Sequence, residues 1–501
     1  MNPLLSAALL LLSGASLTFA FAPFNAWPVI FPALAVAIIQ LYKRSDKGFL
    51  TGWLFGLGWF GAGISWVHVS IADFGGMPLI ASVGIMVLLC AYLALYPALA
   101  FWITKRIFTP ALWPLSLPAI WFVTEWLRSW MLSGFPWLSL GYSQIDSPLA
   151  GWMPVIGETG VSALIMILCS AGAIWLLRRQ YLPVALLFAV TFVSGYLLRQ
   201  HNWVTPHEQK SVAMVQGNIK QSLRWMPEQD RPTMEKYRKL TQPLWNNDLI
   251  IWPEAAVPKL EYLANNYLSN MDDVAARHST AIITGIVNYN FETEEAWNNL
   301  IVLGEKEDGS GAHYRYLNAN RYAKHHLLPV GEFVPFEDFL RPLAPLFDLP
   351  MSSFARGDFV QPNLIANGIH LAPAICFEIA FPHQVAANIQ RDTDMIITVS
   401  NDAWFGDSHG PAQHLEMARV RALEFGRPVV RATNNGITAF IDERGTLTGV
   451  LPQFEEGTIS KTVTTTRGIT PYRYLGEIPV ALLLAISIGA AWLMQRKRRQ
   501  Q

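Results

Sequence analysis

The sequence predicts a membrane α-helical bundle of about eight spans, joined to an α/β domain that is inserted before the last span. Of the 501 residues, 52% are hydrophobic and only 15% are charged, whereas soluble domains carry about 25% charged residues. Only five acidic residues precede residue 200, and only Glu477 follows residue 475. We therefore expect seven membrane helices in residues 1–200, an outward α/β domain in 211–465, and the last span with a basic tail in 476–501.

Eight apolar stretches approach the roughly 20 residues that a helix needs to cross a bilayer. They run over Leu4 to Ala20, Trp27 to Tyr42, Phe49 to Val69, Leu79 to Ile103, Leu112 to Met131, Val161 to Leu177, Leu182 to Leu198, and Ile478 to Met494. The fifth contains Glu125 and Arg128, and a charge near the bilayer centre costs roughly 2.5 to 3.5 kcal/mol. These two residues either pair on one helix face and point into the bundle, or mark an interfacial helix end.

The positions of the basic residues predict the orientation of the spans, because Lys and Arg accumulate on the cytoplasmic side. Basic residues follow every even-numbered span, at 43–47, 105–106, 178–179 and 496–499. Both termini should therefore face the cytoplasm, and residues 200 to 475 should face outward. No Lys or Arg precedes the first apolar run, so a retained helix is favoured over a cleaved signal peptide.

The third span is rich in small residues, with glycines at positions 52, 56, 58, 61 and 63. Residues 56–61 match a dinucleotide-binding fingerprint, but they follow no strand, so that match is accidental. Close packing between helices explains these glycines better.

Between polar linkers at Pro206 to Lys210 and Thr464 to Pro471, short apolar runs alternate with amphipathic stretches. The expected strands are Ser211 to Val215, Asp248 to Trp252, Ala281 to Val287, Asn299 to Leu303, Ile369 to Ile375, Met395 to Ser400 and Gly436 to Asp442. The expected helices are Tyr262 to Arg277 and Ala412 to Phe425. Several strands are apolar throughout, which favours an α/β domain with a covered sheet.

One cysteine of this outward domain, Cys376, has no partner there, since Cys90 and Cys169 lie in apolar stretches. An unpaired thiol in an oxidising compartment is either buried and inert or a reactive nucleophile. Cys376 ends an apolar, strand-like run, which favours the second interpretation. Two further strand ends carry Glu254 and Lys324. Taken singly each signal is weak, because such residues are usually a solvated Glu, a surface Lys and a packing Cys.

Taken together, Glu254, Lys324 and Cys376 with their flanking residues resemble the nitrilase superfamily over roughly residues 212 to 462. That superfamily uses Glu, Lys and Cys in this chain order and folds as an αββα sandwich. The helices before and after the domain are similar to its membrane-anchored branch, the apolipoprotein N-acyltransferases. The resemblance implies a multi-pass protein of the bacterial inner membrane with its catalytic domain in the periplasm.

The resemblance also implies roles for these residues. Glu254 would be the general base and Cys376 the nucleophile that carries a thioester, while Lys324 and the backbone N–H of Phe377 would bind the oxyanion. Glu332 would position Lys324 or Glu254, and Glu378 would order the loop after the nucleophile.

The implied acyl donor is a membrane glycerophospholipid such as phosphatidylethanolamine. The implied acceptor is the α-amine of the diacylglyceryl cysteine that begins an apolipoprotein. No cofactor or metal is expected, and the zero net charge argues against nucleic acid. Aromatic residues that could form a lid, or pack in the core, are Trp225, Phe336, Phe339 and Phe347.

Four other interpretations compete with acyl transfer. Residues 406–410 match the nucleophile elbow of serine hydrolases around Ser408, but no histidine follows His414 to complete that triad. The spacings of His325, His326, His409 and His414 do not fit a zincin helix. A transporter is disfavoured, because transporters usually carry polar or broken helices at the membrane midplane, whereas the spans of this chain are almost uncharged. A membrane-anchored amidase with the same triad remains the main alternative.

Overall fold

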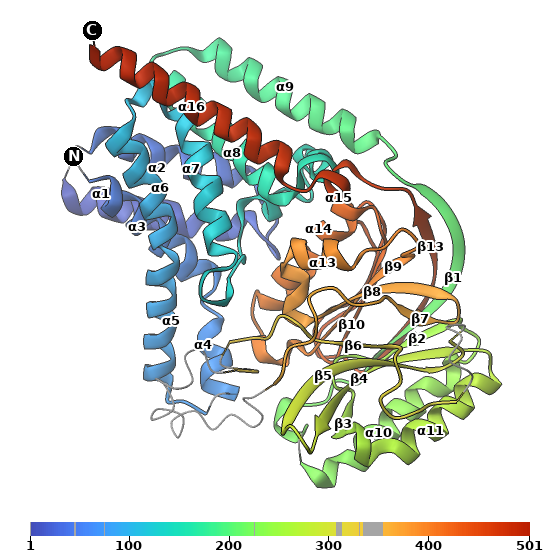
Figure 1. Cartoon of the computed structure of the whole chain (residues 1–501). Coiled ribbons are helices and arrows are strands. Elements are labelled where there is room, and N and C mark those ends of the chain that lie inside the picture. Colours follow the sequence, from blue (N-terminus) through green and yellow to red (C-terminus); the bar gives the residue numbers. More distant parts are fainter. Residues whose placement is uncertain are drawn as a thin grey trace. The chain divides into compact units, whose positions relative to one another are not determined.

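The computed structural model describes residues 2–44, 47–74, 76–224, 226–306, 313–329, 331–333 and 354–500 (Figure 1). The chain packs into two units. The helical unit comprises Met1–His68, Pro78–Trp203 and Thr470–Gln501, and the sandwich unit comprises Val69–Met77 and Val204–Ile469. The sequence did not indicate that residues 69–77 pack with the second unit.

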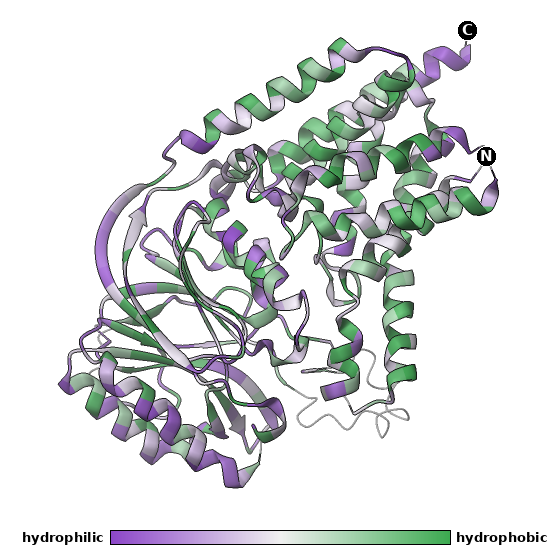
Figure 2. Ribbon diagram, turned by 180° about the vertical axis from the view of Figure 1, so that it is seen from behind, coloured by the Kyte–Doolittle hydropathy of each residue, from purple (hydrophilic) through white to green (hydrophobic). Residues whose placement is uncertain are grey.

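The helical unit is built from long apolar helices, which appear as mostly hydrophobic ribbons in Figure 2. Its main helices are α1 (Pro3–Ser16), α2 (Ile30–Lys43), α3 (Gly48–Gly63), α5 (Leu79–Leu93), α6 (Leu95–Ile107), α7 (Trp113–Arg128), α8 (Met153–Leu177), α9 (Tyr181–Gln200) and α16 (Ile478–Gln500). Short α4 (Val67–Val69) and α15 (Pro471–Leu475) accompany them.

Among the described residues, five helices are long and apolar enough to cross a membrane, and α3 with the segment to Asp73 makes a sixth if that 60° bend lies within one span. The apolar helix Trp27–Lys43 is shorter, and α7, the predicted fifth span, has only 16 residues. The sequence estimate of about eight spans is therefore approximate.

The two charges of α7 point into the helical unit, as one of the two interpretations of the sequence had it. Arg128 Nη2 lies 3.7 Å from Glu125 Oε1, and both side chains are almost fully buried. Arg128 Nη1 also donates to the carbonyls of Phe135 and Trp137, each at 2.7 Å. Pairing and hydrogen bonding offset the cost of placing these charges among apolar helices.

Glycines let α3 approach its neighbours closely. A Cβ atom on Gly58 would lie 2.1 Å from the Leu11 carbonyl oxygen of α1, and one on Gly52 would lie 2.4 Å from the Pro97 carbonyl oxygen of α6. Both distances are shorter than any tolerated contact, so only glycine fits. A Cβ atom on Gly61 would meet nothing within 4 Å, so close packing does not explain that glycine.

The sandwich unit contains two sheets. The first has the strand order β13–β1–β2–β4–β5–β6, with β3 paired to β4; the second has the order β12–β11–β10–β9–β8–β7. The strands are β1 (Thr205–Gln216), β2 (Leu249–Ile251), β3 (Val257–Leu260), β4 (Ala281–Asn290), β5 (Glu295–Gly304), β6 (Arg321–Ala323), β7 (Leu364–Ala366), β8 (Ile369–Ile375), β9 (Met395–Ser400), β10 (Val429–Thr433), β11 (Thr438–Ile441), β12 (Leu447–Leu451) and β13 (Gly457–Arg467).

The two sheets pack face to face between helices, which makes the αββα sandwich that the sequence predicts. Ile251 and Ile283 of the first sheet share one buried core with Ile375 and Ile397 of the second. The other face of the first sheet packs against Leu268 and neighbouring side chains of the helices. The helices are α10 (Pro227–Thr241) and α11 (Glu261–Arg277) on the first sheet, and α13 (Pro382–Asn388) and α14 (Gly410–Phe425) on the second (Figure 1).

The two polar linkers expected at Pro206 to Lys210 and Thr464 to Pro471 were wrong. β1 begins at Thr205 and pairs antiparallel with β13, from Thr205 opposite Arg467 to Gln216 opposite Gly457. At the outer end of this ribbon β1 is polar and exposed, whereas Thr465 and Thr466 of β13 are polar but buried. Ladder hydrogen bonds join backbone groups whatever the side chains are, so hydrophobicity did not indicate the ribbon.

Substitution of Gly58 by alanine should destabilise the protein, because the new methyl group overlaps the backbone of α1. Overpacking of this kind costs typically about 1–3 kcal/mol. Thermal unfolding of the detergent-solubilised protein should show a lower Tm for Gly58→Ala, and an unchanged or higher Tm for the matched variant Gly61→Ala. Equal effects in the two variants would contradict the packing role.

Candidate active site

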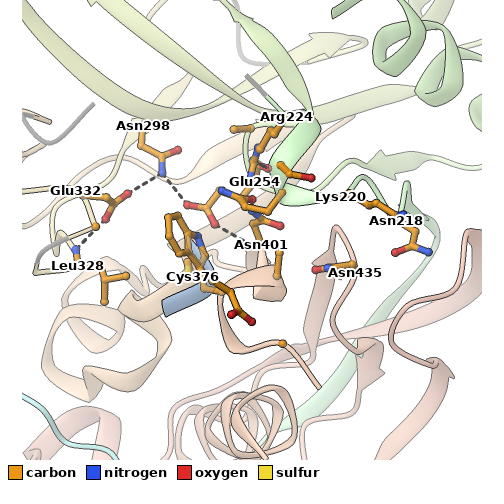
Figure 3. A pocket seen from close by; sticks show the side chains of 18 of the residues that line it. Asn218, Lys220, Arg224, Glu254, Asn298, Leu328, Glu332, Cys376, Asn401 and Asn435 are labelled. Atoms are coloured by element: carbon orange, nitrogen blue, oxygen red, sulfur yellow. Dashed lines mark hydrogen bonds between the residues drawn. The ribbon is translucent and has the colours of Figure 1, made fainter. Parts of the chain in front are cut away.

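The ends of several strands bring polar side chains to one cavity of about 920 Å³ (Figure 3). Glu254 follows β2, Lys324 follows β6 and Cys376 follows β8, and all three line this cavity. The structure thus brings together the three residues singled out from the sequence, although they are far apart along the chain.

Cys376 occupies a sharp turn at the end of β8. Its φ angle is +53°, in the left-handed region that residues other than glycine rarely adopt, at a cost of order 1–3 kcal/mol. Cys376 also begins the short 3₁₀-helix Cys376–Ala380, and its side chain is only 7% exposed. The backbone thus changes from strand to helix at Cys376, which lines the cavity.

The carboxylate of Glu378 holds this turn against the loop that carries Lys324. It is fully buried and accepts hydrogen bonds from the backbone N–H groups of His325 (2.8 Å), His326 (3.0 Å) and Ile375 (2.7 Å). The hydroxyl of Tyr322 and the amide of Gln384 also donate to it. One side chain therefore fixes the backbone on both sides of the site.

Glu254 and Glu332 share one amide donor. Asn298 Nδ2 on β5 donates to Glu254 Oε1 at 2.7 Å and to Glu332 Oε1 at 3.1 Å, as Figure 3 shows. The backbone N–H of Asn401, just after β9, donates to Glu254 Oε2 at 3.0 Å. These contacts fix the orientation of the Glu254 carboxylate in the cavity.

Lys324 lies between the same two carboxylates. Its Nζ is 2.7 Å from Glu332 Oε2 and 3.6 Å from Glu254 Oε1. Glu332 is itself held by the backbone N–H of Leu328, at 2.8 Å. Glu332 thus contacts Lys324 directly, and both Lys324 and Asn298 link it to Glu254.

Glu254 approaches β4 closely because that strand carries a glycine. A Cβ atom on Gly285 would lie 2.2 Å from the backbone nitrogen of Ala255 and 2.8 Å from Glu254 Cα. Ala255 has a φ angle of +44°. The chain after β2 therefore turns tightly over Gly285, which presents Glu254 to the cavity.

The electrostatics keep the sulfur neutral and the amine charged in the resting site. Burial, reinforced by the Glu254 carboxylate, raises the pKa of Cys376 to about 12, although Lys324 opposes this. Burial lowers the pKa of Lys324, but Glu332 and Glu254 outweigh that effect and leave the pKa above its usual value. A base would therefore have to remove the thiol proton before the sulfur could act as a nucleophile.

The remaining residues singled out from the sequence are either outside the described residues or packed beside the site. Trp225, Phe336, Phe339 and Phe347 lie outside the described residues. Phe377 is buried and packs edge-on against Phe381. Sequence reasoning missed Asn298 and Asn401 as site residues, because their hydrogen-bond partners come from distant segments of the chain.

The rival motifs have local roles. Ser408 Oγ accepts a hydrogen bond from the N–H of Gly410 at 3.1 Å, and Ser408 is not among the residues that line the cavity. Among the described residues, ligand atoms of Asp272, Asp273 and His313 lie within 4.8 Å of one another. Lys306 Nζ lies 2.8 Å from Asp272 Oδ1 and already neutralises that carboxylate.

Comparison with known proteins extends over both units. The model of the apolipoprotein N-acyltransferase N-terminal domain matches residues 13–171, and the carbon-nitrogen hydrolase model matches residues 211–472. Apolipoprotein N-acyltransferase of Vibrio cholerae is 48% identical, covering 96% of this chain and 95% of that protein. The chain belongs to the apolipoprotein N-acyltransferase family.

A relative with the same name in Haemophilus influenzae is 41% identical and covers 100% of this chain and 97% of its own length. Among solved structures, Saccharomyces cerevisiae Nit3, a member of branch 10 of the nitrilase superfamily, is similar at 14% identity and a TM-score of 0.37, covering 53% of this chain and 92% of that one. The nitrilase-like fold rests on the matched carbon-nitrogen hydrolase model and on the two-sheet architecture.

Replacing Glu378 by glutamine should destabilise the site, because an amide nitrogen would face N–H donors that now bind a carboxylate oxygen. Each buried donor left without an acceptor costs about 1–3 kcal/mol. We expect a Tm several degrees lower and acyl transfer at least about tenfold slower. The exposed Glu292 provides the matched control, and an effect of Glu292→Gln as large as that of Glu378→Gln would contradict this role.

The raised pKa of Cys376 predicts the pH dependence of its alkylation. Because the thiolate reacts and its pKa is about 12, the rate of modification by iodoacetamide should keep rising through pH 9 and 10 without a plateau. The rate should be measured by mass spectrometry in a variant with Cys90 and Cys169 replaced by alanine. A plateau below pH 9 would show a preformed thiolate instead.

Proposed function

We propose that this chain moves a fatty acyl chain from a membrane glycerophospholipid, such as phosphatidylethanolamine, to the α-amine of the N-terminal diacylglyceryl cysteine of an apolipoprotein. The observation that carries the proposal is the convergence of Glu254, Lys324 and Cys376 on one cavity. The names of the relatives, which match over nearly the whole chain, support it.

In the first half-reaction the Glu254 carboxylate takes the proton of the Cys376 thiol as the sulfur attacks the ester carbonyl of the phospholipid. The Lys324 ammonium and the Phe377 N–H stabilise the oxyanion, and one such donor is worth about 2.7–4 kcal/mol of barrier. The tetrahedral intermediate then collapses. The ester C–O bond breaks, the lysophospholipid oxygen takes the proton from Glu254, and the acyl chain stays on sulfur as a thioester.

In the second half-reaction the α-amine of the apolipoprotein attacks the thioester carbonyl. Glu254 takes a proton from the attacking amine and the carbon–sulfur bond breaks. The proton passes to the departing sulfur, which restores the thiol and leaves an amide on the apolipoprotein. The neutral resting thiol suits this cycle, because each half-reaction returns Glu254 to its ionised form.

We place the chain in the bacterial inner membrane, with the sandwich unit on the periplasmic side and both termini in the cytoplasm. The basic residues after the even-numbered apolar stretches support this orientation. Both substrates are lipids that lie in the membrane, so a site anchored to the membrane has direct access to them. Trp225, Phe336, Phe339 and Phe347 are proposed as aromatic contacts for the acyl chains.

An amidase with the same triad would transfer the acyl group to water. It is not favoured, because the matched relatives share the helical part as well as the nitrilase-like part. An enzyme acting on small soluble amides has no need of the apolar helices that both this chain and its relatives carry.

Incubation with phospholipid labelled in its acyl chain, without an acceptor, should yield an adduct on Cys376 that hydroxylamine removes. Cys376→Ser should give no such adduct, whereas Cys169→Ser should label like the unsubstituted protein. Addition of a diacylglyceryl peptide with a free α-amine should move the label to that peptide. Label on Cys376 that passes only to water would favour the amidase, and label on another residue would overturn the proposal.

A further inference from the structure

A buried polar cluster lies beneath the nucleophile and has no part in the mechanism above. It consists of Ser400, Asp402, His414 and Arg431, all 2% exposed or less. Arg431 Nη2 lies 2.6 Å from Asp402 Oδ2, and Ser400 Oγ donates to Asp402 Oδ1 at 2.5 Å. Burying two charges and an imidazole inside the sandwich is costly unless each group has partners. A function for this cluster would explain why the fold contains it.

His414 links the cluster to the nucleophile. Its Nε2 lies 2.9 Å from the backbone carbonyl oxygen of Cys376. A carbonyl oxygen can only accept, so Nε2 carries the proton and donates. On the other side of the ring, Nδ1 lies 3.1 Å from both Arg431 Nη2 and Asp402 Oδ1, and it accepts from the guanidinium.

The surroundings keep this ring neutral. Burial and the Arg431 guanidinium lower the pKa of His414, although Asp402 opposes them. Burial raises the pKa of Asp402, but the Arg431 guanidinium outweighs that effect and holds the pKa below its usual range. The imidazole thus has one fixed tautomer, with a donor at Nε2 that is directed at Cys376.

The Cys376 carbonyl belongs to the same planar peptide unit as the N–H of Phe377, and the two point in opposite directions. A hydrogen bond that fixes the carbonyl therefore also fixes the N–H. The parallel ladder of β8 with β9 has its last partners at Ile375 and Val399, so Cys376 lies just beyond it. There the backbone turns to a φ of +53°, and His414 contacts it at that point.

We propose that His414 is a positioning residue, which orients and polarises the Cys376–Phe377 peptide so that the Phe377 N–H faces the oxyanion of each tetrahedral intermediate. This inference rests on the proposed function, in which that N–H is an oxyanion donor. The Arg431 guanidinium, which is itself paired with Asp402, holds the ring in place through its hydrogen bond to Nδ1. A donor at the carbonyl end also strengthens the hydrogen bond that the N–H end gives, because linked hydrogen bonds polarise one another.

Two amide variants test this role. In His414→Gln the side-chain amide nitrogen falls near the position of Nε2 and keeps the donor to Cys376. In His414→Asn the shorter side chain reaches only the position of Nδ1. Both are made with Cys90 and Cys169 replaced by alanine, and thermal unfolding establishes that each variant folds.

Two reactions of Cys376 are then compared: acylation by labelled phospholipid, which passes through an oxyanion, and alkylation by iodoacetamide, which does not. We expect His414→Asn to slow acylation on the order of 10- to 100-fold, while alkylation changes less than about twofold. His414→Gln should acylate at close to the parent rate. Should His414→Asn not fold, His414→Phe, which fills the space of the ring without a donor, takes its place.

Three results would overturn the inference: unchanged acylation in His414→Asn, equal slowing of acylation and alkylation, or equal loss in the Asn and Gln variants. The second would mean that His414 only supports the fold. Failure of the parent protein to acylate Cys376 at all would instead remove the proposed function, and so the two failures are distinguishable.

Discussion

The geometry of the site depends on one buried carboxylate, that of Glu378. It accepts hydrogen bonds from both sheets of the sandwich, through Tyr322 of β6 in the first and Ile375 of β8 in the second. Three of its donors are backbone N–H groups, which every substitution other than one to proline leaves in place. Cys376 follows a strand of the second sheet and Lys324 follows a strand of the first, and this carboxylate keeps the two loops at a fixed separation.

A second constraint is the balance of charge in a cavity whose key side chains are almost fully buried. Lys324 lies between Glu254 and Glu332, and Asn298 joins the two carboxylates. Ion pairs in such surroundings are stable only when hydrogen bonds satisfy the remaining polar atoms. The arrangement keeps one positive charge next to the sulfur without forming the thiolate in advance. A neutral thiol resists oxidation.

The sequence predicts best those elements whose burial requires a recognisable run of apolar residues. β8 and β9 were predicted with the bounds that they have, Ile369–Ile375 and Met395–Ser400, because both of their faces are covered and nearly every residue is apolar. β1 and β13 were misread at their outer ends because backbone and threonine hydrogen bonds join them there, and these leave no hydrophobic pattern in the sequence. The span count is approximate because helices such as α7 are short.

The convergence of Glu254, Lys324 and Cys376 on one cavity could be predicted, because these three residues follow strands in an order that resembles a known superfamily. Asn298, Asn401, Asp402 and His414 could not, because each is a single polar residue whose partners come from distant segments. His414 was considered only as a metal ligand, and nothing in the spacing of histidines reveals a contact with the carbonyl of Cys376. Such contacts arise from tertiary structure alone.

The pairing of β1 with β13 brings the entry and the exit of the sandwich unit side by side, at Thr205 and Arg467. This two-stranded stem, formed by β1 and β13, suggests that residues 204–469 could be produced as a separate domain. The short segment Val69–Met77 argues otherwise, since it packs with this unit and its Asp73 lines the cavity. A fragment cut at the stem would retain thiol, carboxylate and ammonium, yet it would lack part of one wall of its pocket.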